Sequence, residues 1–277
     1  MAQNSNEIKY INVEKTIKES NSKLLNKLPG FIVKLIVKII KQKEINRFLN
    51  KHSDSIGRDF LIKIIEEYNI KIEVEGKENF PENGKCIFVA NHPFGLIDGL
   101  VLTHIVSGKY GSIKAIANDA FMLIPQLHPF IAAVNVFEGS SKEYLKALDE
   151  TYYTEVPITH FPAGEVSRLY SGKVQDTKWQ KSFITKSIAS NRDIVPIYFY
   201  GRNSNLFYTI FLLRRLLGIN INLELILLPR EFFKKRNKTI KVKIGEPIPY
   251  QTFDKSLTHW DWAQNVRKRL YSLSDKN

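Results

Sequence analysis

The chain has 277 residues, of which 43% are hydrophobic and 12% aromatic, so it can bury a sizeable core and is not expected to be disordered. Its 41 Lys and Arg residues against 28 Asp and Glu residues give a net charge of +13. This excess favours a negatively charged partner, such as nucleic acid, an anionic membrane or an acidic substrate. The single cysteine, Cys86, excludes an internal disulfide framework and a cysteine-rich metal site, and is compatible with a reducing compartment.

The N-terminal part of the chain is polar at first and then becomes helical. The first 25 residues lack the apolar core of a secretory signal, so we do not expect export. The stretch FIVKLIVKIIK, residues 31–41, places Lys34, Lys38 and Lys41 along one face of an otherwise apolar helix. This pattern fits either a helix packed on its own domain with a solvated lysine face or a helix that lies in a membrane interface.

Neither of the two most apolar stretches is predicted to span a membrane. A spanning helix needs about 20 nearly uncharged apolar residues. The lysines interrupt residues 31–41, and Arg214 and Arg215 interrupt residues 207–228.

From about residue 70, short β-like runs alternate with helical stretches. Several runs are continuously apolar, as in strands buried on both faces, and the helices between them suggest crossover connections. The expected strands lie in IKIEVEG, KCIFVANHP, SIKAIAN, AAVNVFEG, VPITHFPAG, DIVPIYFYG, INLELILL and KTIKVKIGEPI, and the expected helices span 141–152, 178–189, 204–217 and THWDWAQNVRKRLYSL. We predict an α/β fold with a mixed, largely parallel sheet flanked by helices. Residues 1–70 would form a helical, membrane-associating segment and residues 71–277 the α/β domain.

The stretch NHPFGLIDG, residues 91–99, carries the first candidate site. The apolar run before it is predicted to be a buried strand, which places His92 at the carboxyl end of a strand, where open α/β sheets bind their ligands. Pro93 and Gly95 predict a turn before a helix that starts near residue 97. Such a turn lets Asp98 fold back onto His92.

An imidazole held by a carboxylate at one nitrogen can accept a proton at the other. His92 and Asp98 are therefore candidates for a general base and its orienting partner. The alternative is structural, with Asp98 capping the helix and His92 hydrogen-bonded at the end of the strand.

A second motif, THFPAGEVSR, also follows a β-like run, and the two strand ends can share one cleft. Gly164 allows close approach of the backbone, and Glu165, Ser167 and Arg168 offer an acceptor, a hydroxyl and a planar cation for phosphate or carboxylate. Without the first motif, a turn with a surface salt bridge would explain this pattern. In IVPIYFYGRNS, Arg202 is either a further anion-binding residue or an ordinary surface arginine.

Together these motifs resemble the PlsC-like glycerolipid acyltransferase superfamily. NHPFGLIDG is similar to the His/Asp catalytic block, residues 117–139 to the block that shapes the acceptor site, FPAGEVSR to the FPEG block, and IVPIYFYG to the fourth block. The four blocks occur in the order of the family, over about residues 70–250.

Two departures distinguish the chain from the usual pattern. Five residues separate His92 from Asp98 instead of four, and Ala163 stands where Glu follows FP, with Glu165 two places later. NHPFGLIDG, FPAGEVSR and YGRNS look like the haemolysin-like branch, which includes acyltransferases that complete ornithine and glycine lipids.

The resemblance implies attack of an acceptor hydroxyl on an acyl thioester, with His92 as the base, Asp98 as its partner and no covalent acyl-enzyme. The residues implied to bind the acceptor or its headgroup are Gly164, Glu165, Ser167, Arg168, Arg202 and Asn118. The implied partners are a lyso-lipid acceptor, acyl-CoA or acyl carrier protein, and a membrane surface, with no nucleic acid. No metal or other cofactor is expected.

A lyso-lipid stays in the bilayer, so the resemblance places the protein at the cytoplasmic face of the inner membrane as a peripheral or monotopic protein. Residues 31–41, 207–218 and the basic stretch 229–243 are the candidates for contact. Two alternatives remain open: a catalytically inactive lipid-binding protein on the same fold, and a basic nucleic-acid-binding protein, for which the chain shows no recognisable motif.

Overall fold

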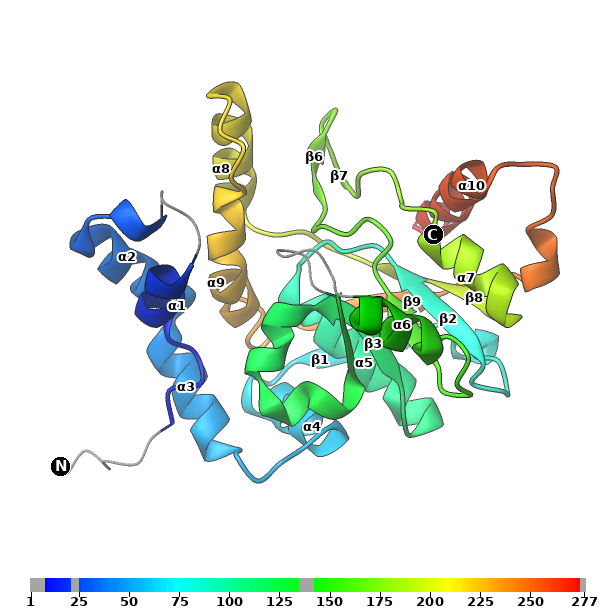
Figure 1. The fold of residues 1–277 in the computed structure, drawn as a ribbon, viewed down its shortest axis with the longest axis horizontal. Helices are drawn as coiled ribbons and strands as arrows, with labels where there is room; N and C mark the ends of the chain where they lie inside the picture. The colour runs from blue at the N-terminus through cyan, green and yellow to red at the C-terminus, as the bar shows by residue number, and fades with distance from the viewer. Residues whose placement is uncertain (1–7, 21–24, 135–141, 275–277) are drawn as a thin grey trace.

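A computed structural model describes residues 8–20, 25–134 and 142–274, and within this part of the chain a seven-stranded sheet forms the centre (Figure 1). The strand order is β1-β9-β8-β2-β5-β3-β4. Every neighbouring pair is parallel except β8 and β9, so the predicted mixed, largely parallel sheet is confirmed. The strands are β1 (Lys71–Glu75), β2 (Cys86–Ala90), β3 (Lys114–Asn118), β4 (Ile131–Val134), β5 (Ile158–His160), β8 (Asp193–Phe199) and β9 (Thr239–Ile244).

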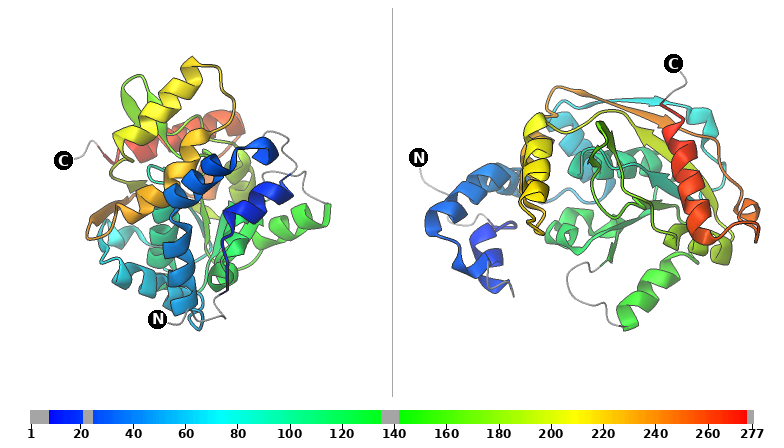
Figure 2. Two further views of the ribbon diagram at one scale, coloured as in Figure 1. Left: turned by 90° about the vertical axis from the view of Figure 1, so that its left-hand side faces the viewer. Right: turned by 90° about the horizontal axis from the view of Figure 1, so that it is seen from above.

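Helices cover both faces of the sheet, as Figure 2 shows from two further sides. Side chains alternate along a strand, so Phe88 of β2 packs in the cluster that includes α4 (Arg58–Glu67) and α5 (Leu96–Tyr110). Its neighbours Ile87 and Val89 pack in the cluster that includes α7 (Ser182–Ser190) and α10 (His259–Tyr271). Burial on both faces explains why the run CIFVA is uninterrupted by polar residues.

The segment before residue 70 contains α1 (Val13–Glu19), α2 (Gly30–Ile40), α3 (Gln42–Lys51) and α4. Phe48 and Leu49 of α3 share the core cluster of α4 and α5, and the domain boundary at residue 70 stays a prediction. The helix α2 packs against α9 (Leu228–Phe233), while Phe31 and Leu35 stay exposed beside Lys34. Of the described helices, none is long and apolar enough to cross a membrane.

The expectation of a strand in INLELILL is wrong. Residues Leu223–Leu227 form the 3-10 helix η5, and α9 begins at Leu228. In a 3-10 helix residues i and i+3 lie on the same face, and this places Glu224 and Leu227 together against the domain while Leu223 and Leu225 are exposed. In a strand, Glu224 and Leu227 would point to opposite faces of the sheet.

The other expected helices form with shifted ends as α6 (Lys142–Thr151), α7, α8 (Asn205–Leu216) and α10. Part of the expected strand AAVNVFEG, residues 135–139, lies outside the described residues. A small antiparallel hairpin, β6 (Arg168–Tyr170) and β7 (Lys173–Gln175), was not anticipated from the sequence.

A buried ionic network ties this hairpin to the α8–η5 unit. The Glu224 carboxylate accepts hydrogen bonds from Nε of Arg168 at 2.9 Å and from Nε of Arg214 at 2.6 Å, and both Arg168 and Glu224 are fully buried. Burial alone would raise the pKa of Glu224, but the hydrogen bond from Arg214 and the attraction of both arginines hold that pKa below its usual value.

We expect Glu224→Gln to lower the free energy of unfolding by about 3 kcal/mol at pH 7, because it leaves the buried cation of Arg168 and the partly buried cation of Arg214 without their counter-charge. A carboxyl group with a lowered pKa in the folded state stabilises the fold above its unfolded pKa and loses that effect as pH falls. The difference between wild type and variant should therefore shrink below about pH 4.5. Glu246, which pairs with Arg269 at the surface, supplies the control Glu246→Gln, expected to cost less than about 0.5 kcal/mol. Equal losses in the two variants by urea unfolding would contradict the assignment.

Candidate active site

The carboxyl ends of three adjacent strands form the site. In the sheet, β2 lies between β5 and β8, with Val89 paired to His160 and Ala90 to Ile197. Beyond the last pair, the side-chain amide of Asn91 takes part in the ladder: its Oδ1 accepts from Phe199 N at 2.7 Å and its Nδ2 donates to Phe199 O at 3.0 Å. The side chain thus continues the ladder by one step, and the chain then leaves the sheet at His92.

The turn after His92 brings Asp98 back to it. Nδ1 of His92 lies 3.1 Å from Oδ2 of Asp98, and Asp98 is fully buried. Gly95 has φ of +90°, and a Cβ there would lie 2.8 Å from Leu228, so the turn requires glycine. The extra residue between His92 and Asp98 is absorbed in this turn.

Asp98 also caps the N-terminus of its own helix, α5. It is the third residue of α5, and its Oδ2 accepts from Phe94 N at 2.9 Å and from Gly95 N at 3.3 Å. The capping and the histidine-pairing interpretations therefore hold together. Nδ1 of His92 is buried and meets no partner in good hydrogen-bond alignment, a condition common at catalytic hydrogen bonds before substrate binds.

The ring of His92 is stacked on Phe161, with 4.0 Å between centroids and 25° between planes. Phe161 follows β5, and Ser167 N donates to His92 O at 2.8 Å. The two sequence motifs therefore meet at His92, as the prediction of a shared cleft requires.

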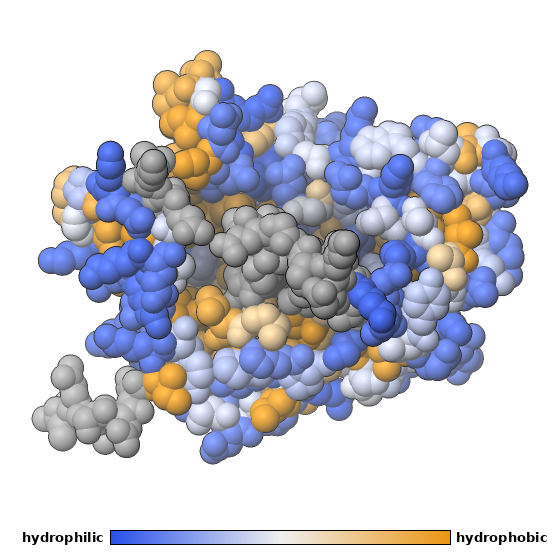
Figure 3. Space-filling model, in the orientation of Figure 1, coloured by the Kyte–Doolittle hydropathy of each residue, from blue (hydrophilic) through white to orange (hydrophobic). Residues whose placement is uncertain are grey.

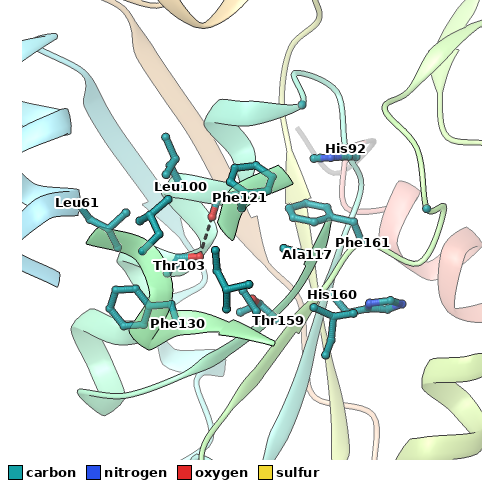
Figure 4. Close-up of a pocket in the computed structure, with 17 residues that line it drawn as sticks. Leu61, His92, Leu100, Thr103, Ala117, Phe121, Phe130, Thr159, His160 and Phe161 are labelled. Carbon is teal, nitrogen blue, oxygen red and sulfur yellow. Dashed lines mark hydrogen bonds between the residues drawn. The ribbon is translucent and has the colours of Figure 1, made fainter. Parts of the chain in front are cut away.

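An apolar pocket of about 250 Å³ opens beside His92 on the α5 face of the sheet. Figure 4 shows His92 and Phe161 at one end and Leu61 and Phe130 at the other. The block over residues 117–139 supplies part of the lining, namely Ala117, Phe121, Leu127, Phe130 and Ile131. A pocket of this chemistry accommodates a hydrocarbon chain whose polar end lies at the imidazole.

The predicted headgroup residues are not all at the pocket. Gly164 lines it, with φ of +69°, but Glu165 and Arg202 are not among the lining residues. Arg202 is exposed and donates to Asn205 Oδ1 at 2.7 Å. Asn118 ends β3, and its side chain lies outside the described residues.

The headgroup roles expected of Arg168 and Ser167 do not fit their positions. The guanidinium of Arg168 is fully buried against Glu224, with its centre 5.1 Å from the Phe207 ring. The buried hydroxyl of Ser167 donates to Asp176. Nη2 of Arg168 has no hydrogen-bond partner, but it is buried with the rest of the guanidinium. Because both groups lie inside the protein, neither is exposed to a ligand in this arrangement.

Two titratable side chains in the strands, His160 at the end of β5 and Cys86 at the start of β2, are neutral near pH 7. Burial lowers the pKa of His160 to about 4 and raises the pKa of the Cys86 thiol to about 12. A neutral, buried thiol is a poor nucleophile. Within the described part of the chain, no three His, Cys, Asp or Glu side chains are grouped to hold a metal ion.

Phe161 and Asp176 are the site residues that sequence reasoning missed. Phe161 belongs to the FPAG block, so its position in a motif was a usable signal. Asp176 stands between the β6–β7 hairpin and α7 in a stretch without a motif, and only the fold shows that it reaches His92.

An α/β sheet with a His-Asp pair at its strand ends and an apolar pocket beside it suits acyl transfer from a long-chain substrate. A family model described as "Acyltransferase" matches residues 15–277. The chain belongs to this acyltransferase family, which confirms the resemblance to the PlsC-like superfamily.

Two curated relatives are 39% identical to the chain over 264 residues. They are the lyso-glycine lipid O-acyltransferases of Phocaeicola vulgatus and Bacteroides thetaiotaomicron; the matches cover 95% of this chain and 95% and 97% of those proteins. Among solved structures, the 1-acyl-sn-glycerophosphate acyltransferase PlsC of Thermotoga maritima has a TM-score of 0.47 at 17% identity, covering 96% of this chain and 88% of that chain.

We expect Asp98→Asn to lower kcat of acyl transfer by about 100-fold or more, because the amide keeps the cap but removes the charge beside the imidazole. Asp261 occupies the same third position in α10, so Asp261→Asn is the matched control. Steady-state kinetics of the two variants, with thermal melting as a check on folding, decide the point. A comparable kcat in both would exclude the charge of Asp98 from the reaction.

Proposed function

We propose that the protein is a membrane-associated O-acyltransferase that moves a fatty acyl group from an acyl thioester to the hydroxyl of a lyso-lipid. The observation that carries this proposal is the His92–Asp98 pair at the end of an apolar pocket. The relatives named above support a lyso-glycine lipid as the acceptor, since they match nearly the whole chain.

The proposed reaction is a direct transfer. Nε2 of His92 takes the proton of the acceptor hydroxyl while the oxygen forms a bond to the thioester carbonyl carbon. The tetrahedral intermediate then collapses, the C–S bond breaks, and the leaving sulfur receives the proton from His92. The carboxylate of Asp98 stabilises the positive charge that His92 carries between the two steps.

The donor in this proposal is acyl-CoA or acyl carrier protein. Both are anionic, and the net charge of +13 favours their approach. The hydrocarbon chain of the donor or of the acceptor would occupy the pocket between α5 and the sheet, with its reacting end at His92. The reaction as written needs no further cofactor.

Membrane association is part of the proposal, at the cytoplasmic face of the inner membrane. Apolar residues gather at the projecting end of α8 (Figures 1 and 3), where Leu216 is 82% exposed and Leu217 71% exposed. Arg215 stands exposed between them and the body of the helix. Exposed leucines beside cations favour an interface with anionic lipid.

The rival function is lipid binding without catalysis. If His92 is the base, His92→Ala should lower the rate of lyso-lipid acylation by at least about 100-fold while binding of lyso-lipid vesicles is unchanged. His259→Ala, at the exposed start of α10, is the control and should keep full activity. Equal rates for wild type and His92→Ala would favour the inactive lipid-binding protein.

The membrane contact is tested by the double variant Leu216→Asp/Leu217→Asp. We expect its affinity for vesicles of phosphatidylglycerol and phosphatidylcholine to fall by about tenfold or more, since apolar surface no longer enters the bilayer. Ile56 is exposed to a similar degree, 61%, and lies between α3 and α4, so Ile56→Asp controls for a general loss of apolar surface. Unchanged sedimentation of the double variant with vesicles would exclude the end of α8 as the contact.

A further inference from the structure

His92 stands where the chain leaves the sheet, so its backbone N–H and C=O are no longer part of a strand ladder. Buried backbone groups of this kind need other partners. The N–H of His92 donates to Oδ1 of Asp176 at 3.2 Å, and its C=O accepts from Ser167 N at 2.8 Å. Both partners come from the segment that follows β5.

The carboxylate of Asp176 joins these two contacts into one unit. Its Oδ1 also accepts from the hydroxyl of Ser167, while its Oδ2 accepts from Trp179 Nε1 at 2.9 Å. His92, Asp176 and Ser167 therefore form a closed cycle of three hydrogen bonds. Asp176, Ser167 and Trp179 are essentially inaccessible to solvent, so water does not compete for these bonds.

The backbone of Asp176 is fixed in turn by the C-terminal helix. Its N–H donates to the hydroxyl of Tyr271 at 2.7 Å, and its C=O accepts from Nη2 of Arg267 at 2.6 Å. Both residues lie on α10, on the face of the sheet opposite the pocket. Asp176 is thus anchored to α10, a helix that does not line the pocket.

Keeping a carboxyl group at this place has a cost. Burial raises the pKa of Asp176, and the hydrogen bonds from Ser167, Trp179 and His92 oppose that rise only in part. An amide side chain would fill the same space without a buried charge, but it would leave at least one of these donors without an acceptor. A carboxylate is therefore the group that accepts from His92, Ser167 and Trp179 together, and it does so at the cost of its own burial.

We propose that Asp176 is the positioning residue of the acyl-transfer site, which fixes the backbone of His92 so that the imidazole stays between Asp98 and the pocket. The proposal rests on the proposed acyltransferase function for its kinetic consequence. It concerns no contact with substrate, since Asp176 is buried. A base held in place by its backbone reacts from one geometry, and a misplacement of about 1 Å can cost about 100-fold in rate.

The test compares Asp176→Asn and Asp176→Ala with wild type. The amide satisfies either Trp179 or the His92–Ser167 pair, but not both, whereas alanine satisfies neither. We expect kcat to fall about tenfold in Asp176→Asn and about 100-fold in Asp176→Ala, with KM for donor and acceptor within about twofold. A residue that acted only on stability would lower the amount of active enzyme, visible as a lower melting temperature, and would not make kcat per folded molecule fall.

Asp193 provides the matched control. Its carboxylate also accepts a backbone N–H, from Tyr250 at 3.0 Å, but at the opposite end of β8 from the site. Asp193→Asn should leave kcat within about twofold of wild type.

A second measurement does not depend on activity. Hydrogen exchange of the His92 amide, followed by NMR, should accelerate by about tenfold or more in Asp176→Ala and stay unchanged in Asp193→Asn. Unchanged exchange, or faster exchange with an unchanged kcat, would overturn the proposal. If the wild-type protein acylates no lyso-lipid, the proposed function fails, and the exchange rate by itself decides whether Asp176 holds His92.

Discussion

The candidate site is organised around one contact, between the imidazole of His92 and the carboxylate of Asp98, whose nearest nitrogen and oxygen lie 3.1 Å apart. Asp98 can be buried there because it lies at the start of α5, where two backbone N–H groups of the turn meet its oxygen and the helix dipole favours a negative charge. The same bonds that cap the helix therefore hold the carboxylate at the histidine. A glycine with a positive φ closes the turn, so local backbone geometry and the chemistry of the site are inseparable.

The two faces of the sheet differ in their packing beside His92. On the α5 face, small and apolar side chains leave a pocket that ends at His92. On the opposite face, α7 and α10 pack densely around fully buried Trp179, and this face holds Asp176. Transfer of a long acyl chain needs space for that chain and a base that is held in a fixed geometry. The strand ends, where both faces meet, satisfy both requirements.

A basic residue that belongs to a sequence motif is not always exposed to a ligand. Arg168 follows the FPAG block, yet Glu224 and two aromatic rings bury it, and it ties the β6–β7 hairpin to η5 and α8. The cations that stay exposed, such as Lys34 and Arg215, lie on α2 and α8 beside exposed leucines and phenylalanine. These cations, unlike Arg168, are exposed on the surface.

From the sequence alone, the parallel sheet, the end of β2 at His92 and the turn before Asp98 could be determined, because continuous apolar runs, Pro93 and Gly95 act through local geometry. The four motifs in order also identified the family. The tertiary structure decided which polar groups meet. Arg168 donates a hydrogen bond to Glu224, 56 residues later in the chain, and the N–H of His92 donates to Asp176, 84 residues later. The conformation of INLELILL was also decided by partners elsewhere in the chain. Its buried side chains, Glu224 and Leu227, lie three residues apart and contact α8 and β6, which fits a 3-10 helix and not a strand. Pairings between distant segments depend on packing, and no local pattern records them.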